Sequence, residues 1–201
     1  MYTSVRRARH NDGENDRGYT SVGAGSRVAA AMHQVSSEPR KPMREPYVLL
    51  APLGTSPGVL TETVWSLAQD GLVPATVHVM TTATGWEVVA GDLGFETENA
   101  RWDRLSRGVC GLDRPIPVER HVVRGRNGRE LRDIRHEQDD LAFGAACYAL
   151  VRRLTEATNR PPVVGSIAGG RKTMSAHLMT AFCLCARQQD RLVHVLISST
   201  F

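Results

Sequence analysis

The sequence VVGSIAGGRKTMSAH, residues 163–177, decides the fold. A short apolar run is followed by a pair of glycines, two cations and a threonine, and then by residues with the spacing of a helix. Such an apolar run is typical of a strand that is buried on both faces of a parallel sheet. The stretch therefore predicts a strand, a tight turn and the start of a helix, in that order.

The same order of strand and helix recurs along the chain from Pro46 onward. We expect strands at residues 47–53, 75–83, 116–124, 162–168 and 191–198. We expect helices at residues 59–71, 86–108, 141–158 and 171–188, of which the second is interrupted by Gly91 and Gly94. Strands that alternate with helices predict the α/β class: a Rossmann-like parallel sheet of about five to six strands, with helices on both faces.

Residues 1–45 are expected to form a disordered, basic and polar extension, and residues 46–201 the folded domain. The segment RRARHNDGENDRGYTSVGAGS lacks sustained periodicity and has too little apolar surface to offset the entropy of ordering. Met43 directly precedes the first expected strand, so the extension is interpreted as dispensable or as the product of an upstream start. A solvated tail is favoured over one that binds nucleic acid.

Charge and composition exclude several classes of protein. Eight of the 25 Lys and Arg and five of the 21 Asp and Glu lie in residues 1–45, which leaves 17 basic and 16 acidic residues in the folded part. This balance does not predict binding of long nucleic acid. No apolar run approaches the roughly 20 residues that span a membrane, and the first residues lack the apolar core that would predict a secretory signal. The four cysteines lack C-x-x-C spacing, and Cys183 and Cys185 lie in an apolar helical context, so we expect buried free thiols and not a disulfide or zinc site. A cytoplasmic protein without a cofactor fits best.

Two of the expected strand-to-helix loops have chemistry that suits a phosphate group. They are GTSPG, residues 54–58, and AGGRKTMS, residues 168–175. Ligands of open parallel sheets bind beyond the carboxyl ends of the strands, where such loops gather. Helix N-termini present unpaired N–H groups, and Arg171 and Lys172 add positive charge. Either loop alone also fits an ordinary helix start, but the two together favour an anion site.

The second loop is close to the phosphate-binding pattern G-x-x-x-x-G-K-[ST] of nucleotide hydrolases, but Arg171 places Lys172 one position too late. Those enzymes also hold magnesium with an aspartate at the end of a neighbouring strand, and no expected strand here ends in one. The sequence therefore disfavours a magnesium-dependent nucleotide hydrolase. Ser56 has no evident histidine partner, so it is interpreted as a positioning group and not as a nucleophile.

The loop after the third expected strand is rich in arginine. It either is a solvated charged loop or folds over the carboxyl edge of the sheet to contact phosphates, with Asp133, Asp139 and Asp140 neutralising part of its charge. The arginines are Arg124, Arg126, Arg129, Arg132 and Arg135. Among the histidines, His78 and His194 are interpreted as core or edge residues of strands, and His177 is a weak catalytic candidate.

Several segments resemble the CARF (CRISPR-associated Rossmann fold) ring nuclease family. They are LLAPLGTSPGVLTETVWSL, VHVMTTATG, VVRGRNGRELRDIR, and VVGSIAGGRKTMSAHLMTAF followed by DRLVHVLIS, and together they run from about Tyr47 to Ser198. The resemblance implies a homodimer whose two-fold axis crosses the ligand site. It also implies a cyclic oligoadenylate ligand made by type III CRISPR systems, with cyclic tetra-adenylate favoured and cyclic hexa-adenylate as the second candidate.

The resemblance further implies metal-independent cleavage that switches off the antiviral signal. The 2′-hydroxyl of the substrate attacks the adjacent phosphorus and leaves 2′,3′-cyclic phosphate ends, while Lys172 stabilises charge, Ser56 positions the ribose or phosphate and Arg171 grips phosphate. The implied ligand-binding residues are Gly54, Thr55, Pro57, Gly58, Thr81, Thr82, Arg132, Arg135, Ala168, Gly169, Gly170, Thr173 and Met174. CARF domains also serve as sensors, so a non-catalytic module that regulates a partner effector is the alternative.

Overall fold

The structure is a computed structural model, and it describes residues 2–5, 46–156 and 159–195. All described residues belong to one compact unit. In the described part, all four cysteines are free thiols, as expected, but Cys183 is exposed and Cys185 only half-buried, so the expected burial of these two is wrong. No helix among these residues combines the length and the apolar character that crossing a membrane requires.

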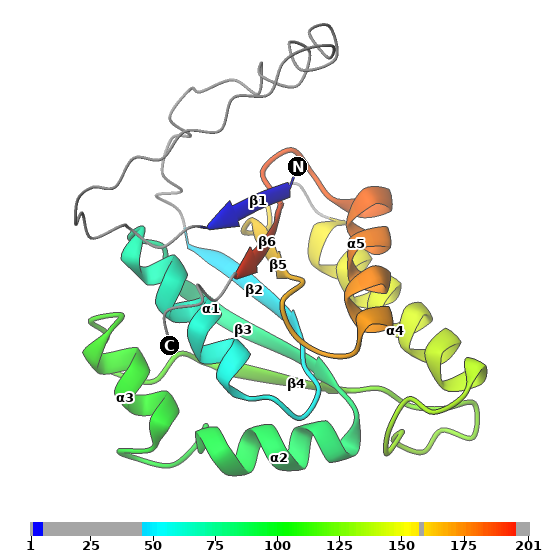
Figure 1. The fold of residues 1–201 in the computed structure, drawn as a ribbon. Coiled ribbons are helices and arrows are strands. Elements are labelled where there is room, and N and C mark those ends of the chain that lie inside the picture. Colours follow the sequence, from blue (N-terminus) through cyan, green and yellow to red (C-terminus); the bar gives the residue numbers. More distant parts are fainter. Residues whose placement is uncertain (1, 6–45, 157–158, 196–201) are drawn as a thin grey trace, which may run out of the picture. The chain divides into compact units, whose positions relative to one another are not determined.

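The described residues form one parallel sheet of six strands, in the order β1-β6-β5-β2-β3-β4 (Figure 1). This confirms the predicted α/β class and the parallel pairing. The strands are β1 (Tyr2–Val5), β2 (Tyr47–Pro52), β3 (Pro74–Thr81), β4 (Val118–Val122), β5 (Val163–Ser166) and β6 (Arg191–Val195).

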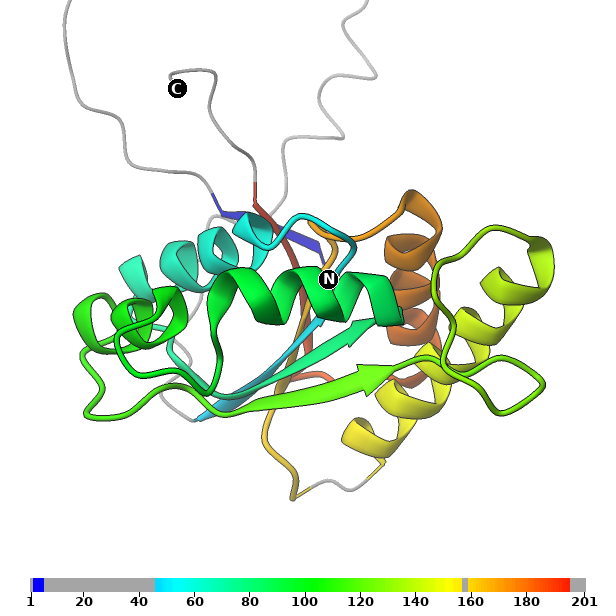
Figure 2. The ribbon, with the colours of Figure 1, turned by 90° about the horizontal axis from the view of Figure 1, so that it is seen from below.

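Within the described residues, five helices cover the sheet: the residues of three pack into the core on one face and those of two into the core on the other. Figure 2 shows the helices on either side of the strands. The segment expected as one interrupted helix is in fact two helices. Gly94 adopts a left-handed conformation with φ of 60° and ends the first of them, whereas Gly91 lies within it. The helices are α1 (Gly58–Gln69), α2 (Ala83–Leu93), α3 (Arg101–Gly108), α4 (Glu137–Thr155) and α5 (Lys172–Cys185).

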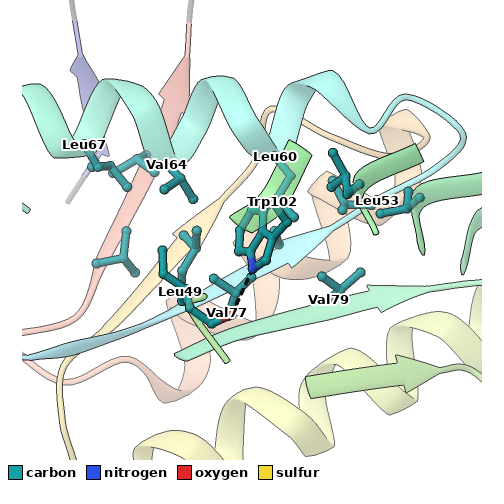
Figure 3. Packing of buried hydrophobic residues seen from close by; sticks show 14 of the residues in the cluster. Leu49, Leu53, Leu60, Val64, Leu67, Val77, Val79 and Trp102 are labelled. Carbon is teal, nitrogen blue, oxygen red and sulfur yellow. Dashed lines mark hydrogen bonds between the residues drawn. The ribbon is translucent and has the colours of Figure 1, made fainter. Parts of the chain in front are cut away.

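The core lies on both faces of the sheet because successive residues of a strand point to opposite sides. Leu49 of β2 packs with Trp102 beneath α1 to α3, and the Trp102 indole N–H donates to the carbonyl of Ile116 at 2.8 Å (Figure 3). The next residue, Leu50, packs with Phe143 against α4 and α5. The continuous apolar run of β2 is thus explained by burial on both faces.

Strand β1 corrects the expectation that all of residues 1–45 lie outside the fold. Tyr2–Val5 pairs in parallel with residues 192–195 of β6 and forms one edge of the sheet. Four residues are too few to show a periodicity, and the pairing is with a strand near the other end of the chain, so no local pattern could indicate it. Residues 6–45 and the expected end of the last strand at residues 196–198 lie outside the described residues.

Between the neighbouring strands β2 and β5, the helices that follow the strands lie on opposite faces of the sheet. After β2 the chain enters α1 on one face, and after the neighbouring β5 it enters α5 on the other face. The two loops therefore separate as they leave the sheet, and a crevice opens between them. These loops are GTSPG and AGGRK, the two that the sequence singled out.

Candidate functional site

A cavity of about 380 Å³ lies at this crevice, beyond the carboxyl ends of β2, β3 and β5. Its walls come from both glycine loops, from the start of α2 and from the loop between β4 and α4. The lining residues are Gly54, Thr55, Ser56, Val59, Thr82, Thr84, Asp133, Ala168, Gly169, Gly170, Arg171 and Met174.

The glycines of the two loops allow the loops to touch. A Cβ atom on Gly169 would lie 2.6 Å from the carbonyl oxygen of Pro52, so only glycine fits against the end of β2. Gly170 adopts a φ of 80°, a conformation that residues with a side chain rarely adopt. A Cβ atom on Gly54 would lie 3.6 Å from the Cα of Gly170. The loop after β5 is therefore held against the loop after β2 by backbone contact (Figure 1).

In two of the helices that begin at the cavity, the side chain of the N-cap residue accepts no hydrogen bond. Neither Pro57 at the start of α1 nor Arg171 at the start of α5 accepts a capping hydrogen bond through its side chain. In α2, by contrast, the Thr82 hydroxyl accepts a hydrogen bond from the N–H of Gly85 at 3.2 Å. The first turns of α1 and α5 thus keep N–H groups and the positive end of the helix dipole for an anion.

Ser175 holds the loop before α5 in place. Its hydroxyl lies 3.1 Å from the carbonyl oxygen of Ile167 and 3.0 Å from that of Gly169. The N–H of Arg171 donates to the Met174 sulfur at 3.2 Å, and the Met174 side chain is buried. These contacts fix the backbone of the loop before any ligand binds.

Arg171 forms an ion pair with Asp133, a residue that the sequence did not predict as part of the site. Its guanidinium donates two hydrogen bonds to the Asp133 carboxylate, at 2.6 and 3.2 Å, and so links the loop before α5 to the loop before α4. The Arg171 guanidinium holds the pKa of that carboxyl below its ordinary value. Asp133 was expected only to neutralise part of the arginine-rich loop, because a pairing across 38 positions leaves no local signal.

Lys172 is the first residue of α5, and it is exposed. Within the described residues its side chain forms no hydrogen bond or ion pair, and it does not line the cavity. It is the only lysine in residues 46–201. Its ammonium group is therefore free to turn toward a ligand at the N-terminus of α5.

The cavity contains most but not all of the predicted ligand-binding residues. Thr81 is fully buried, and its hydroxyl donates to the carbonyl of Leu53 at 2.6 Å, so it joins β3 to β2 and has no surface for a ligand. Arg132 and Arg135 are exposed on the loop before α4, near Glu87 and Asp133 respectively. The other predicted residues that do not line the cavity are Pro57, Gly58 and Thr173, while Val59, Thr84 and Asp133 line it without having been predicted.

His177 serves the packing of two helices and does not line the cavity. Its Nε2 lies 3.0 Å from Oδ2 of Asp140, and its ring packs so closely on Gly144 of α4 that a Cβ there would lie 2.6 Å from the imidazole. Burial raises the pKa of Asp140, but hydrogen bonds from His177 and Thr173 outweigh this effect and lower it. The pair thus joins α4 to α5.

In the part of the chain that the structure describes, potential metal ligands form one group of three. They are His78, Glu119 and His121, and none of them lines the cavity at the crevice.

Comparisons with known proteins agree with this architecture. Residues 56–201 match the family described as CRISPR-associated protein NE0113 (Cas_NE0113). Enterococcus italicus Csm6 bound to cyclic hexa-2'-fluoro-hexa-dAMP has a similar structure, with a TM-score of 0.52 and 15% identity over 76% of this chain and 34% of that chain. At this identity the similarity concerns the fold alone, and the chain spans about a third of the length of that protein.

A type III CRISPR defence DNA nuclease activated by cyclic oligoadenylate gives a TM-score of 0.42 and 19% identity, over 76% of this chain and 19% of that chain. The search of curated proteins found no match. The family match alone spans well over half of the sequence. The chain belongs to the NE0113 family of CRISPR-associated proteins, and its fold is the CARF fold that its motifs resemble.

Proposed function

We propose that this chain is a cytoplasmic ring nuclease of a type III CRISPR system, which binds a cyclic oligoadenylate and cleaves it without a metal ion. The observation that carries the proposal is the pair of touching glycine loops, each of which leads into a helix whose N-cap side chain accepts no hydrogen bond. Two such helix starts at one cavity suit a ligand with more than one phosphate. The structural neighbour Csm6 is bound to cyclic hexa-2'-fluoro-hexa-dAMP, which supports a ligand of this class.

The size of the cavity supports a homodimer around the ligand. Its volume of about 380 Å³ is near the lower end of the range of about 300–1,000 Å³ for small-molecule sites. One chain can therefore enclose only part of a ring of four or six nucleotides. A second copy related by a two-fold axis would enclose the other part, because the ring of cyclic tetra-adenylate, the favoured ligand, contains a two-fold axis.

In the proposed reaction the ring supplies its own nucleophile. A ribose 2′-hydroxyl gives up its proton to water and attacks the adjacent phosphorus. The 5′-oxygen of the next nucleotide leaves, which gives a linear product with a 2′,3′-cyclic phosphate. Ser56 positions the ribose, the N–H groups of Gly169 and Gly170 bind the phosphoryl oxygens, and Lys172 turns in to stabilise the charge and to protonate the leaving oxygen. This chemistry switches off the antiviral signal.

The remaining residues have supporting roles in this proposal. Arg171 holds Asp133 and adds positive charge at the entrance to the phosphate site. Arg132 and Arg135, on the exposed loop before α4, would close over the ring. Thr55, Thr82, Ala168 and Met174 complete the walls, as the sequence motifs implied.

A second candidate is a CARF sensor that binds the ring without cleaving it and regulates a partner effector. One observation favours it: among the described lining residues, Asp133 is the only side chain that could accept or donate a proton as an acid or base, and it is tied to Arg171. Lys172 must reorient before it can take part in the reaction.

Calorimetric titration in the presence of a chelator tests the binding of the ring by two chains, which both candidate functions require. We expect cyclic tetra-adenylate to bind more tightly than cyclic hexa-adenylate, with one ring per two chains, and linear tetra-adenylate to bind more weakly than either. Sedimentation of the complex should give the mass of a dimer. A stoichiometry of one ring per chain, or equal affinity for the linear form, would contradict the shared two-fold site.

A further inference from the structure

Three potential metal ligands converge where β3 pairs with the edge strand β4. His78 lies on β3 opposite Glu119 of β4, and Met80 lies opposite His121. Glu119 and His121 are two positions apart on one strand, so their side chains leave the same face of the sheet. Met80 lies two positions after His78 and therefore on the same face, and it packs with the core beneath α4 and α5. The three potential ligands thus lie on the face that α4 and α5 cover.

The ligand atoms of these residues lie at distances that one metal ion can bridge. Nδ1 of His78 is 2.8 Å from Nε2 of His121, and Oε2 of Glu119 is 3.5 Å from the first nitrogen and 3.8 Å from the second. A tetrahedral Zn²⁺ with bonds of about 2.0–2.2 Å holds its ligand atoms roughly 3.3 Å apart. Shifts of about half an ångström would bring all three atoms to that spacing.

A simple hydrogen bond between the imidazoles is the competing explanation. The two rings lie nearly parallel, at 7°, and one N–H can donate to the other ring's nitrogen. That explanation gives no role to Glu119, whose carboxylate nevertheless approaches both nitrogens although its side chain is 58% exposed. Two imidazoles and one carboxylate are, by contrast, a ligand set that transition metals prefer.

The charge state of the histidines is suitable for metal binding. Burial is the main cause that lowers the pKa of His121 to about 4; His78 and Arg153 act in the same direction, and Glu119 opposes them. Burial also lowers the pKa of His78. Both rings are therefore neutral at pH 7, and their nitrogens can bind a cation. Arg153 of α4 repels a cation at this place, whereas the negative charge of Glu119 attracts it.

One side of the group is open to a further ligand. His121 lines a cavity of about 490 Å³ together with Arg120, Arg124, Glu130 and Arg153. A metal bound by three side chains keeps a fourth position for water or an anion when solvent can reach it. The cavity at the crevice shares none of these residues.

We propose that His78, Glu119 and His121 form a binding site for a divalent transition metal, with Zn²⁺ as the occupant. The ion would tie the edge strand β4 to β3. The site lies outside the residues of the proposed ring nuclease reaction and is independent of that function.

The test is metal titration of the full chain, freed of any affinity tag and treated with a chelator. The readouts are calorimetry with Zn²⁺ and the visible absorption of Co²⁺, which reports tetrahedral coordination. The variants are Glu119→Gln and His121→Gln. The matched controls are Glu130→Gln, which removes a carboxylate from the neighbouring cavity, and His136→Gln, which removes an exposed histidine outside the group.

We expect the parent and both controls to bind one Zn²⁺ per chain. Glu119→Gln should bind at least tenfold more weakly, since even changes in outer-shell partners typically cost 10–100-fold, and His121→Gln should lose the Co²⁺ spectrum. Zn²⁺ should raise the melting temperature of the parent but not that of Glu119→Gln, whose exposed side chain allows the variant to fold. Parent-like binding by both ligand variants, or no stoichiometric binding by the parent, would overturn the proposal.

Discussion

The crevice between β2 and β5 and the histidine group between β3 and β4 are built in opposite ways. The crevice is formed mainly from backbone, namely from glycines and from helix starts whose N-cap side chains leave N–H groups free. The histidine group is formed from side chains, and two of them are 43 positions apart. A backbone site requires glycines at particular positions within one loop and so has a sequence motif, whereas a side-chain site depends on the strand register and has none.

The largest effect is expected from Gly169→Ala, because the crevice depends on close contact between loops. The added Cβ would lie 2.6 Å from the carbonyl oxygen of Pro52, which cannot move without moving β2. We expect a loss of about 1–3 kcal/mol in the free energy of unfolding, as for overpacking, and loss of ring binding in calorimetry. Gly91→Ala in α2, where the Cβ meets nothing within 4 Å, is the matched control and should bind normally. Normal binding by Gly169→Ala would show that the loops do not need this contact.

The next largest effect is expected from Lys172→Ala. If its ammonium stabilises the phosphoryl charge, the single-turnover rate should fall at least tenfold, or about 1.4 kcal/mol in the barrier, while ring affinity changes less. Arg152→Ala, which removes an exposed cation of α4, is the control and should cleave at the rate of the parent. An unchanged rate in Lys172→Ala would remove Lys172 from the reaction.

A smaller effect is expected from Asp133→Asn. The Arg171–Asp133 pair is partly exposed, with side chains 54% and 31% accessible, so breaking it should cost only about 0.2–1 kcal/mol of stability. The change frees Arg171 for phosphate and removes a negative charge from the cavity. We expect ring affinity to rise by up to about fivefold, with a steeper dependence on salt. Weaker binding would mean that the ion pair organises the site and does not compete with the ligand.

The smallest effect concerns the pH dependence of stability at the histidine group. The pKa of His121 is about 4 in the folded chain, against 6.5 for a free imidazole, so the unfolded chain takes up the proton first as pH falls. Stability should therefore fall as pH drops from about 7 toward 4, by roughly half a kcal/mol for this imidazole between pH 7 and pH 6. Urea unfolding of metal-free protein measures it, and His121→Gln should reduce the slope. An equal slope in the variant would show that His121 titrates normally.

The sequence predicts those parts of the fold that have local patterns. Strands such as Tyr47–Pro52 are apolar runs, and helices such as Lys172–Cys185 begin after glycine turns, so both were found. Strand β1 was missed because its pairing with β6 spans nearly the whole chain.

The residues of the candidate site likewise fall into those that a local pattern predicts and those that it does not. The lining glycines were predicted because they are required by the backbone at their own positions. Asp133 was missed, and Thr81 was wrongly expected to face the ligand, because the placement of both depends on tertiary contacts with Arg171 and Leu53.

Single-turnover incubation of labelled cyclic tetra-adenylate with excess protein, in the presence of a chelator, tests the central claim most directly. The account predicts linear products with 2′,3′-cyclic phosphate ends, formed at the same rate with and without chelator. Ring recovered bound but intact after long incubation would contradict cleavage and identify a sensor. Ring that remains unbound would contradict the assignment of the crevice as its site.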